Sequence, residues 1–119
     1  ARVQRFPDRT TPLGRLIDMF LKSGREVDDE VLHVLFAANR WQAAQAILDT
    51  LNRGVSVIVD RYSYSGVAYS ASKGVDQTWC LSFEKGLPAP DLVVFLDIDP
   101  QAAALRSDYG GGGVLKNEF

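Results

Sequence analysis

The stretch Val55–Gly66, with the sequence VSVIVDRYSYSG, decides how the rest of the chain is organised. Its first residues are mostly β-branched and follow a turn residue, Gly54, so they predict a short buried strand. At the carboxyl end of that strand Asp60 and Arg61 stand side by side, before small hydroxyl residues and a glycine. Ligands of open α/β sheets bind at the carboxyl ends of the strands. Asp60 and Arg61 could therefore bind a metal ion and a phosphate together. For the dipeptide alone, a surface ion pair is an equally good interpretation.

The composition is that of a globular protein with one compact domain. The chain has 119 residues, of which 46% are hydrophobic and 24% charged, and its net charge of −2 gives no basic field for nucleic acid or an anionic membrane. The longest apolar runs, such as Leu92–Leu96, are too short to span a bilayer. One cysteine, Cys80, and one histidine, His33, exclude a cysteine–histidine metal cluster. The charge and the short apolar runs predict no nucleic acid or membrane partner. The lone cysteine fits a reducing compartment, so we expect an intracellular protein of the cytoplasm, with the nucleus as a second location.

Helices alternate with strands along the rest of the chain. Apolar spacing, caps and breaker residues predict helices over about 13–21, 28–53, 63–72, 76–83 and 100–105, a second buried strand over 92–98, and a strand edge or end over 2–6. We expect the first helix to bury Leu13, Leu16, Ile17 and Phe20, and the long helix to bury Leu32, Leu35, Phe36, Ala43, Ile47 and Leu51. The alternation predicts a parallel α/β sheet.

Two further features have ordinary structural interpretations. His33 is most simply a histidine on the surface of the long helix. The glycine run at 110–113 is typical of a mobile loop, and residues 114–119 are too few to assign.

Four short segments carry a resemblance to a known family. They are Phe6–Arg9 (FPDR), Leu35–Trp41 (LFAANRW), Val59–Tyr69 (VDRYSYSGVAY) and Gly86–Leu92 (GLPAPDL). Each segment is a weak signal alone, but together, in this order and at this spacing, they are highly specific. The chain resembles the thymidylate kinases, which are P-loop nucleoside monophosphate kinases, over nearly all of residues 6–109.

The resemblance implies a fold, an activity and partners. The fold is a three-layer α/β arrangement in which helices flank a parallel sheet, as in P-loop NTPases. The activity is transfer of the ATP γ-phosphate to dTMP, which gives dTDP and ADP on the way to dTTP, with Mg²⁺ as cofactor and dTMP and ATP as partners. The family also forms homodimers, and the long helix over 28–53 is the natural surface for this contact.

The resemblance assigns a nucleotide site as well. It places the thymine ring flat on Phe36 and brings Arg40, one helical turn further along, within reach of the base or the phosphate. Without the resemblance these two residues would be a core aromatic and a solvated arginine. We further expect the bulky side chain of Tyr69 to disfavour ribonucleotides near the sugar 2′ position. The dTMP-binding residues that the family pattern implies are Phe6, Arg9, Phe36, Arg40, Arg61, Ser65, Gly66 and Tyr69.

Three charged residues are implied to be catalytic: Arg9, Arg61 and Asp60. The two arginines would hold the monophosphate, because a guanidinium group binds phosphate oxygens bidentately and stays charged. The acceptor and the ATP γ-phosphate are both anions, so these cations would offset their repulsion. Asp60 would serve Mg²⁺, through water, and would not be a general base, because the phosphate acceptor is already nucleophilic.

One feature of the family is not found in the sequence. The phosphate-binding loop of the form G-x-x-x-x-G-K-[ST] supplies the ATP cradle, and no other residue can replace it. We therefore expect residues 1–119 to be a single partial domain that lacks the P-loop strand and the C-terminal elements, has an altered lid, exposes hydrophobic sheet edges and is inactive alone. Two alternatives stay open: another deoxynucleoside or nucleoside monophosphate kinase, or a catalytically silent nucleotide-binding fragment.

Overall fold

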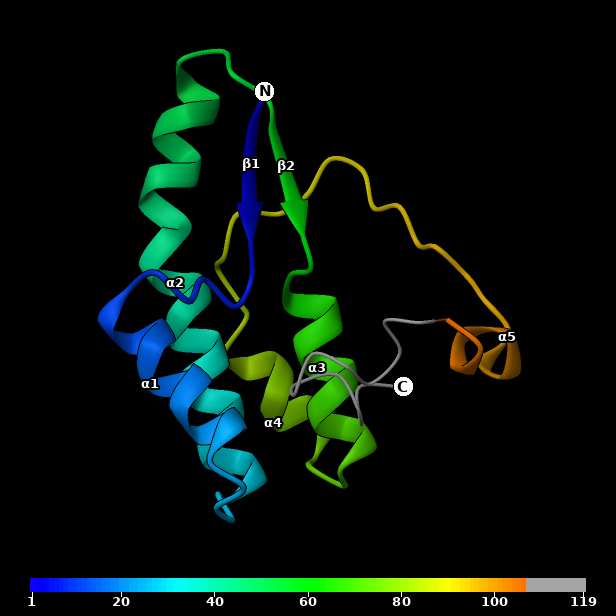
Figure 1. Cartoon of the computed structure of the whole chain (residues 1–119). Coiled ribbons are helices and arrows are strands. Elements are labelled where there is room, and N and C mark those ends of the chain that lie inside the picture. The colour runs from blue at the N-terminus through cyan, green and yellow to red at the C-terminus, as the bar shows by residue number, and fades with distance from the viewer. Residues whose placement is uncertain (107–119) are drawn as a thin grey trace.

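Two parallel strands form the sheet in the computed structural model, which describes residues 1–106 (Figure 1). β1 (Arg2–Arg5) pairs with β2 (Val57–Asp60), in a register that sets Arg2 opposite Val57 and Arg5 opposite Asp60. This pairing confirms the prediction of an α/β fold with a parallel sheet. The glycine run at 110–113 and residues 114–119 lie outside the described residues.

Each predicted helix is confirmed with nearly the predicted bounds. The helices are α1 (Pro12–Lys22), α2 (Asp29–Asn52), α3 (Ser63–Ser72), α4 (Gln77–Ser82) and α5 (Pro100–Ala104). Local capping explains why two of them start where they do. The Thr11 hydroxyl accepts the Gly14 N–H at 3.0 Å, and the Asp76 carboxylate accepts the Trp79 N–H at 2.8 Å. Within residues 1–106 no helix is long and apolar enough to cross a membrane.

The long helix α2 packs against α1, α3 and β2, whereas α5 lies apart from it (Figure 1). A first core cluster, where α1 meets α2, contains Ile17, Leu32 and Phe36. A second cluster, at α3 and α4, contains Val67, Val75 and Cys80. The predicted burial is wrong for Leu16 and Leu51, which are exposed. Periodicity identifies the apolar face of a helix, but it does not say how far the neighbouring elements cover that face.

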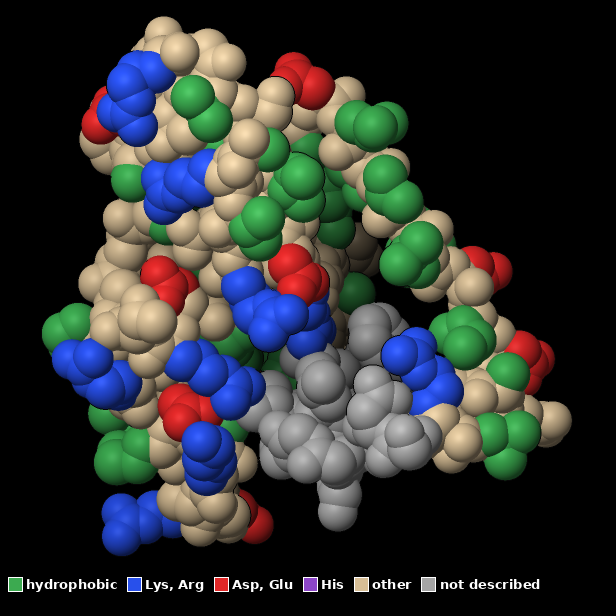
Figure 2. Space-filling model, turned by 45° about the horizontal axis from the view of Figure 1, so that its top comes forward, with side chains coloured by type: hydrophobic (Ala, Val, Ile, Leu, Met, Phe, Trp, Pro, Cys, Tyr) green, Lys and Arg blue, Asp and Glu red, His purple; other side chains and the backbone are tan. Residues whose placement is uncertain are grey.

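The prediction of a second buried strand over 92–98 is wrong for this structure. The segment is extended but belongs to no sheet, its side chains are exposed, and it runs away from β2 toward α5 (Figure 1). The burial expected for β2 is also wrong, because Ile58 is 59% exposed and its register neighbour Val3 is 70% exposed. A buried strand needs neighbours along its edge and over its face, and within residues 1–106 none pairs with 92–98 or with the second edge of β2. Figure 2 shows the resulting apolar surface, which agrees with the expected exposure of hydrophobic sheet edges.

Candidate active site

A pocket opens at the carboxyl ends of the two strands. Because β1 and β2 run parallel, the residues that follow them emerge side by side, Phe6 after β1 and Arg61 after β2. Side chains from α2 and α3 complete the walls. The lining residues are Phe6, Pro7, Phe36, Arg40, Arg61, Tyr62, Ser65, Gly66 and Tyr69. The pocket therefore brings together the predicted dTMP-binding residues with one exception, Arg9.

Aromatic rings make up the apolar part of the pocket. Phe36 of α2 meets Tyr69 of α3 edge to face, with ring centroids 6.0 Å apart and an interplanar angle of 82°. Phe6 and Tyr62 lie 5.7 Å apart, and the Tyr62 hydroxyl donates to the Pro88 carbonyl at 3.0 Å. Flat aromatic surfaces of this kind suit a planar heterocycle, because stacking on a ring is favourable for any base.

Arg61 occupies a strained backbone position at the exit of β2. Its φ of 65° lies in the left-handed region, which costs a non-glycine residue on the order of 1 kcal/mol. Its Nε and Nη2 atoms both donate to the Ser65 hydroxyl, at 3.1 and 2.9 Å. The turn and this hydroxyl together hold the guanidinium at the pocket, which is the kind of place where backbone strain is tolerated for function.

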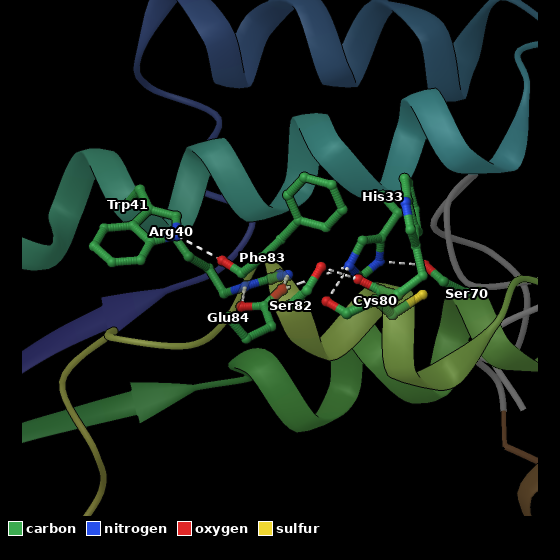
Figure 3. A network of polar contacts seen from close by, with 9 residues as sticks. His33, Arg40, Trp41, Ser70, Cys80, Ser82, Phe83 and Glu84 are labelled. Atoms are coloured by element: carbon green, nitrogen blue, oxygen red, sulfur yellow. Dashed lines mark hydrogen bonds and ion pairs between the residues drawn. The ribbon is translucent and has the colours of Figure 1, made fainter.

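Arg40 is buried, and its partner is Glu84, a residue that we did not predict from the sequence. Arg40 Nε donates to Glu84 Oε2 at 2.8 Å, and Arg40 Nη2 donates to Glu84 Oε1 (Figure 3). The guanidinium also lies against Gly66, where an added Cβ would be 2.7 Å from Arg40 Nη1. A buried arginine requires an anionic partner. If the burial of Arg40 had been known, it would have indicated a nearby Asp or Glu, but the sequence does not show which one.

The interpretation of His33 as a surface residue is wrong, because α3 and α4 cover that side of α2 and the ring is fully buried. His33 Nε2 lies 3.1 Å from the Cys80 carbonyl oxygen, which can only accept, so Nε2 carries the proton. His33 Nδ1, 2.6 Å from the Ser70 hydroxyl, is then the acceptor of that hydroxyl proton (Figure 3). Burial lowers the pKa of His33, and it outweighs the opposing effects of the Cys80 carbonyl and the Glu84 carboxylate.

This lowered pKa makes the stability of the fold depend on pH. In the unfolded chain His33 takes up a proton as the pH falls through about 6.5, whereas the buried ring resists protonation. We expect the free energy of unfolding to fall between pH 7 and pH 5, by up to about 1.4 kcal/mol per pH unit. Urea unfolding at several pH values measures this slope.

The matched variant is His33→Gln. His33 is the only histidine in the sequence, so the substitution should flatten the slope above pH 5, where carboxylates contribute little. An unchanged slope in His33→Gln would show that another group is responsible.

Arg9 and Asp60 lie outside the pocket lining. Arg9 Nη1 donates to Asp18 Oδ1 at 2.7 Å, and Lys22 pairs with the same carboxylate at 2.8 Å. Asp60 Oδ2 accepts from Arg5 Nε at 2.9 Å across the strand pair. The roles of Arg9 in phosphate binding and of Asp60 in metal binding stay predictions.

The residues present set a limit on a metal site. Among residues 1–106 no group of three or more His, Cys, Asp or Glu side chains is placed to hold an ion. Asp60 alone offers one carboxylate at the carboxyl end of β2. This is compatible with Mg²⁺, which usually takes one or two carboxylates together with water and substrate phosphates.

Asn39, which belongs to the LFAANRW segment, positions the segment after β1 through contacts that we did not predict. Its Oδ1 accepts the Asp8 N–H at 2.6 Å, and its Nδ2 donates to the Asp8 carbonyl at 3.0 Å. Because the Asn39 side chain is buried in α2, it ties the segment that carries Phe6 and Arg9 to that helix.

A parallel sheet with flanking helices and an arginine-lined pocket at the carboxyl ends of its strands is the arrangement of α/β proteins that bind phosphorylated ligands. Within that class, the family model of thymidylate kinase matches residues 2–118. The chain therefore belongs to the thymidylate kinase family.

Individual relatives agree with this assignment. The chain is 53% identical to a thymidylate kinase of Dictyostelium discoideum, over 97% of this chain and 52% of that protein. It is 52% identical to the thymidylate kinase of Schizosaccharomyces pombe, over 92% of this chain and 52% of that protein. The solved structure of Candida albicans thymidylate kinase matches with a TM-score of 0.86 and 40% identity, over 92% of this chain and 56% of that one. The chain thus spans about half the length of these relatives.

Proposed function

We propose that the protein that contains this chain transfers the γ-phosphate of ATP to dTMP, giving dTDP and ADP. The observation that carries the proposal is the pocket, which joins an aromatic surface from Phe36 and Tyr69 to the cationic groups of Arg40 and Arg61 at the carboxyl ends of the strands. Membership of the thymidylate kinase family supports it.

The base and the phosphate of the nucleotide would contact different parts of the pocket. The base would stack on Phe36, and the 5′-phosphate would be held by Arg61, whose planar guanidinium can bind two phosphate oxygens at once. Both reacting groups are anions, so a fixed cation lowers the energy of the transition state by reducing their repulsion. Tyr69 would stand beside the sugar and disfavour a 2′-hydroxyl.

Arg9 and Asp60 would join the site by exchanging partners. Their ion pairs with Asp18 and Arg5 are partly exposed, and exposed ion pairs contribute little to stability. The exchange is therefore inexpensive when a phosphate or a metal ion offers a stronger contact. Asp60 would hold Mg²⁺ through water, and the bound ion would supply neutralisation of phosphate charge.

A substrate panel tests the proposal. In the full-length protein with ATP and Mg²⁺, we expect ADP release with dTMP, and a kcat/KM for dTMP at least about tenfold above those for dCMP and dAMP. Equal turnover of dCMP or dAMP would instead support another monophosphate kinase. The panel includes these nucleotides because the structure of the Candida albicans thymidylate kinase is described as revealing the origin of broad substrate specificity. Binding of dTMP without ADP release would support the catalytically silent alternative.

A pair of matched variants links that activity to the pocket. Phe36→Leu keeps an apolar side chain but removes the flat ring, so we expect weaker dTMP binding. Phe20→Leu makes the same change on α1, outside the pocket lining, and should leave dTMP binding as it is.

We also propose a homodimer through α2. Exposed apolar side chains follow one face of this helix, and three of them are spaced by seven residues, as in helix pairs. They are Val31, Val34, Trp41 and Leu48. Leu48→Glu should shift the protein toward monomer in sedimentation, and wild-type protein that is only monomeric at micromolar concentration would contradict the proposal. The intracellular location expected from the single cysteine stays a prediction.

A further inference from the structure

We propose that Glu84 is a positioning residue, which fixes the Arg40 guanidinium at the pocket and thereby sets the affinity for the acceptor nucleotide. The inference rests on the proposed function, because it takes the Arg40 pocket as the acceptor site. Glu84 itself lies outside the residues that line the pocket, so its effect would be exerted through Arg40.

The geometry of the pair fixes the position of the Arg40 guanidinium. Glu84 accepts from Nε and Nη2, with one carboxylate oxygen for each nitrogen. This is the bidentate arrangement, which fixes the plane of the guanidinium as well as its position. The whole guanidinium lies against Gly66, where an added Cβ would be 2.7 Å from Nη1 and 2.8 Å from Nη2. Glu84 therefore fixes the Arg40 guanidinium against Gly66, and both Arg40 and Gly66 line the pocket.

Glu84 is itself held from several directions. It follows α4, where its backbone N–H donates to the Leu81 carbonyl at 3.0 Å. The preceding carbonyl, of Phe83, accepts the Trp41 indole N–H at 2.7 Å and so ties this segment to α2 (Figure 3). The Glu84 side chain is 6% exposed, and His33 Nε2 lies 3.7 Å from its Oε1. These contacts restrict the Glu84 carboxylate to few positions, and so they restrict the Arg40 guanidinium that it binds.

His33 connects these contacts around Glu84 to a third helix, α3. The ring is fixed between the Ser70 hydroxyl of α3 and the Cys80 carbonyl of α4, and the rings of Trp79 and Phe83 lie beside it. α2, α3 and α4 are thus joined around the Arg40–Glu84 pair (Figure 3). The Arg40 and Glu84 side chains are only 4% and 6% exposed, and Arg40 also lines the pocket, so we expect a change at Glu84 to alter the pocket.

The test is the substitution Glu84→Gln in the full-length protein. The glutamine amide has the shape of the Glu84 carboxylate, but it offers only one acceptor oxygen to the two N–H donors of Arg40. One hydrogen bond is therefore lost, and the NH₂ group of the amide faces an N–H group of Arg40. We expect the KM and the Kd for dTMP to rise about tenfold, as for loss of a hydrogen bond to a charged group. The KM for ATP and the kcat at saturating dTMP should stay within about twofold of wild type.

Two further variants separate positioning from support of the fold. Glu84→Asp keeps the buried charge and should recover part of the dTMP affinity. It also replaces Glu84→Gln as the test variant if the glutamine variant does not fold. In an Arg40→Ala background, Glu84→Gln should have no further effect on the Kd for dTMP, because its effect passes through Arg40. A residue with only a structural role would lower the melting temperature and leave the KM for dTMP unchanged.

The outcomes distinguish this inference from the proposed function. Wild-type protein that neither binds nor turns over dTMP would overturn both. Wild-type turnover of dTMP, combined with a folded Glu84→Gln or Glu84→Asp variant whose KM for dTMP is unchanged, would overturn only the role of Glu84. An equal loss of dTMP affinity from Glu84→Gln in the Arg40→Ala background would also overturn it.

Discussion

Replacement of Gly14 by alanine is expected to destabilise the fold by about 3 kcal/mol or more. A Cβ at this position would lie 1.7 Å from the Asp8 carbonyl oxygen, and the atom in the way belongs to the backbone. That carbonyl cannot move aside easily, because Asn39 holds both the N–H and the C=O of Asp8. Urea unfolding of the full-length protein measures the loss. The same overlap displaces the segment that carries Phe6 and Arg9, so weaker dTMP binding should accompany it.

The prediction runs against helix propensity. Gly14 lies in the first turn of α1, and in a helix alanine is favoured over glycine by about 1 kcal/mol. Gly54→Ala is the matched control, because Gly54 has a φ of 77° and open space around it. It should cost only the conformational strain of about 1 kcal/mol. A Gly14→Ala protein as stable as wild type would show that α1 is free to move away from residue 8.

Local signals account for what could be predicted from the sequence. The N-caps at Thr11 and Asp76 bond to N–H groups three residues away, so a short window contains the whole interaction. The same holds for the end of α2 at Gly54, which has the positive φ that glycine favours. The acid and base after β2 were also visible, because the strand and the turn that follows it are adjacent in the chain.

Interactions between distant residues could not be predicted in this way. Glu84 meets Arg40 across 44 positions, and nothing near either residue specifies the other. His33 was assigned to the surface because its own helix is known from periodicity, whereas the elements that cover it are not. The segment 92–98 shows the same limit for strands. Its composition favours a buried strand, but a strand also requires a neighbour to pair with, and the sequence of the segment does not provide one.

Replacement of Arg61 is expected to separate two properties of this residue, its charge and its backbone conformation. Arg61→Ala and Arg61→Gly both remove the guanidinium, so both should lower kcat/KM for dTMP by about a thousandfold. Their stabilities should differ, because alanine keeps the strain of a φ of 65° and glycine relieves it. We expect the glycine variant to be the more stable of the two by about 1 kcal/mol, as measured by urea unfolding.

Arg61→Lys is the control for charge alone. It keeps a cation but loses the planar fork that contacts the Ser65 hydroxyl through two nitrogens, so its kcat/KM should lie between those of wild type and the alanine variant. Equal stability of the glycine and alanine variants would show that the turn relaxes when the arginine is removed. Turnover of dTMP within threefold of wild type in either variant would contradict a role for Arg61 in holding the phosphate. A glycine variant that is more stable and yet inactive would mean that the strain at this turn is retained because the pocket requires an arginine there.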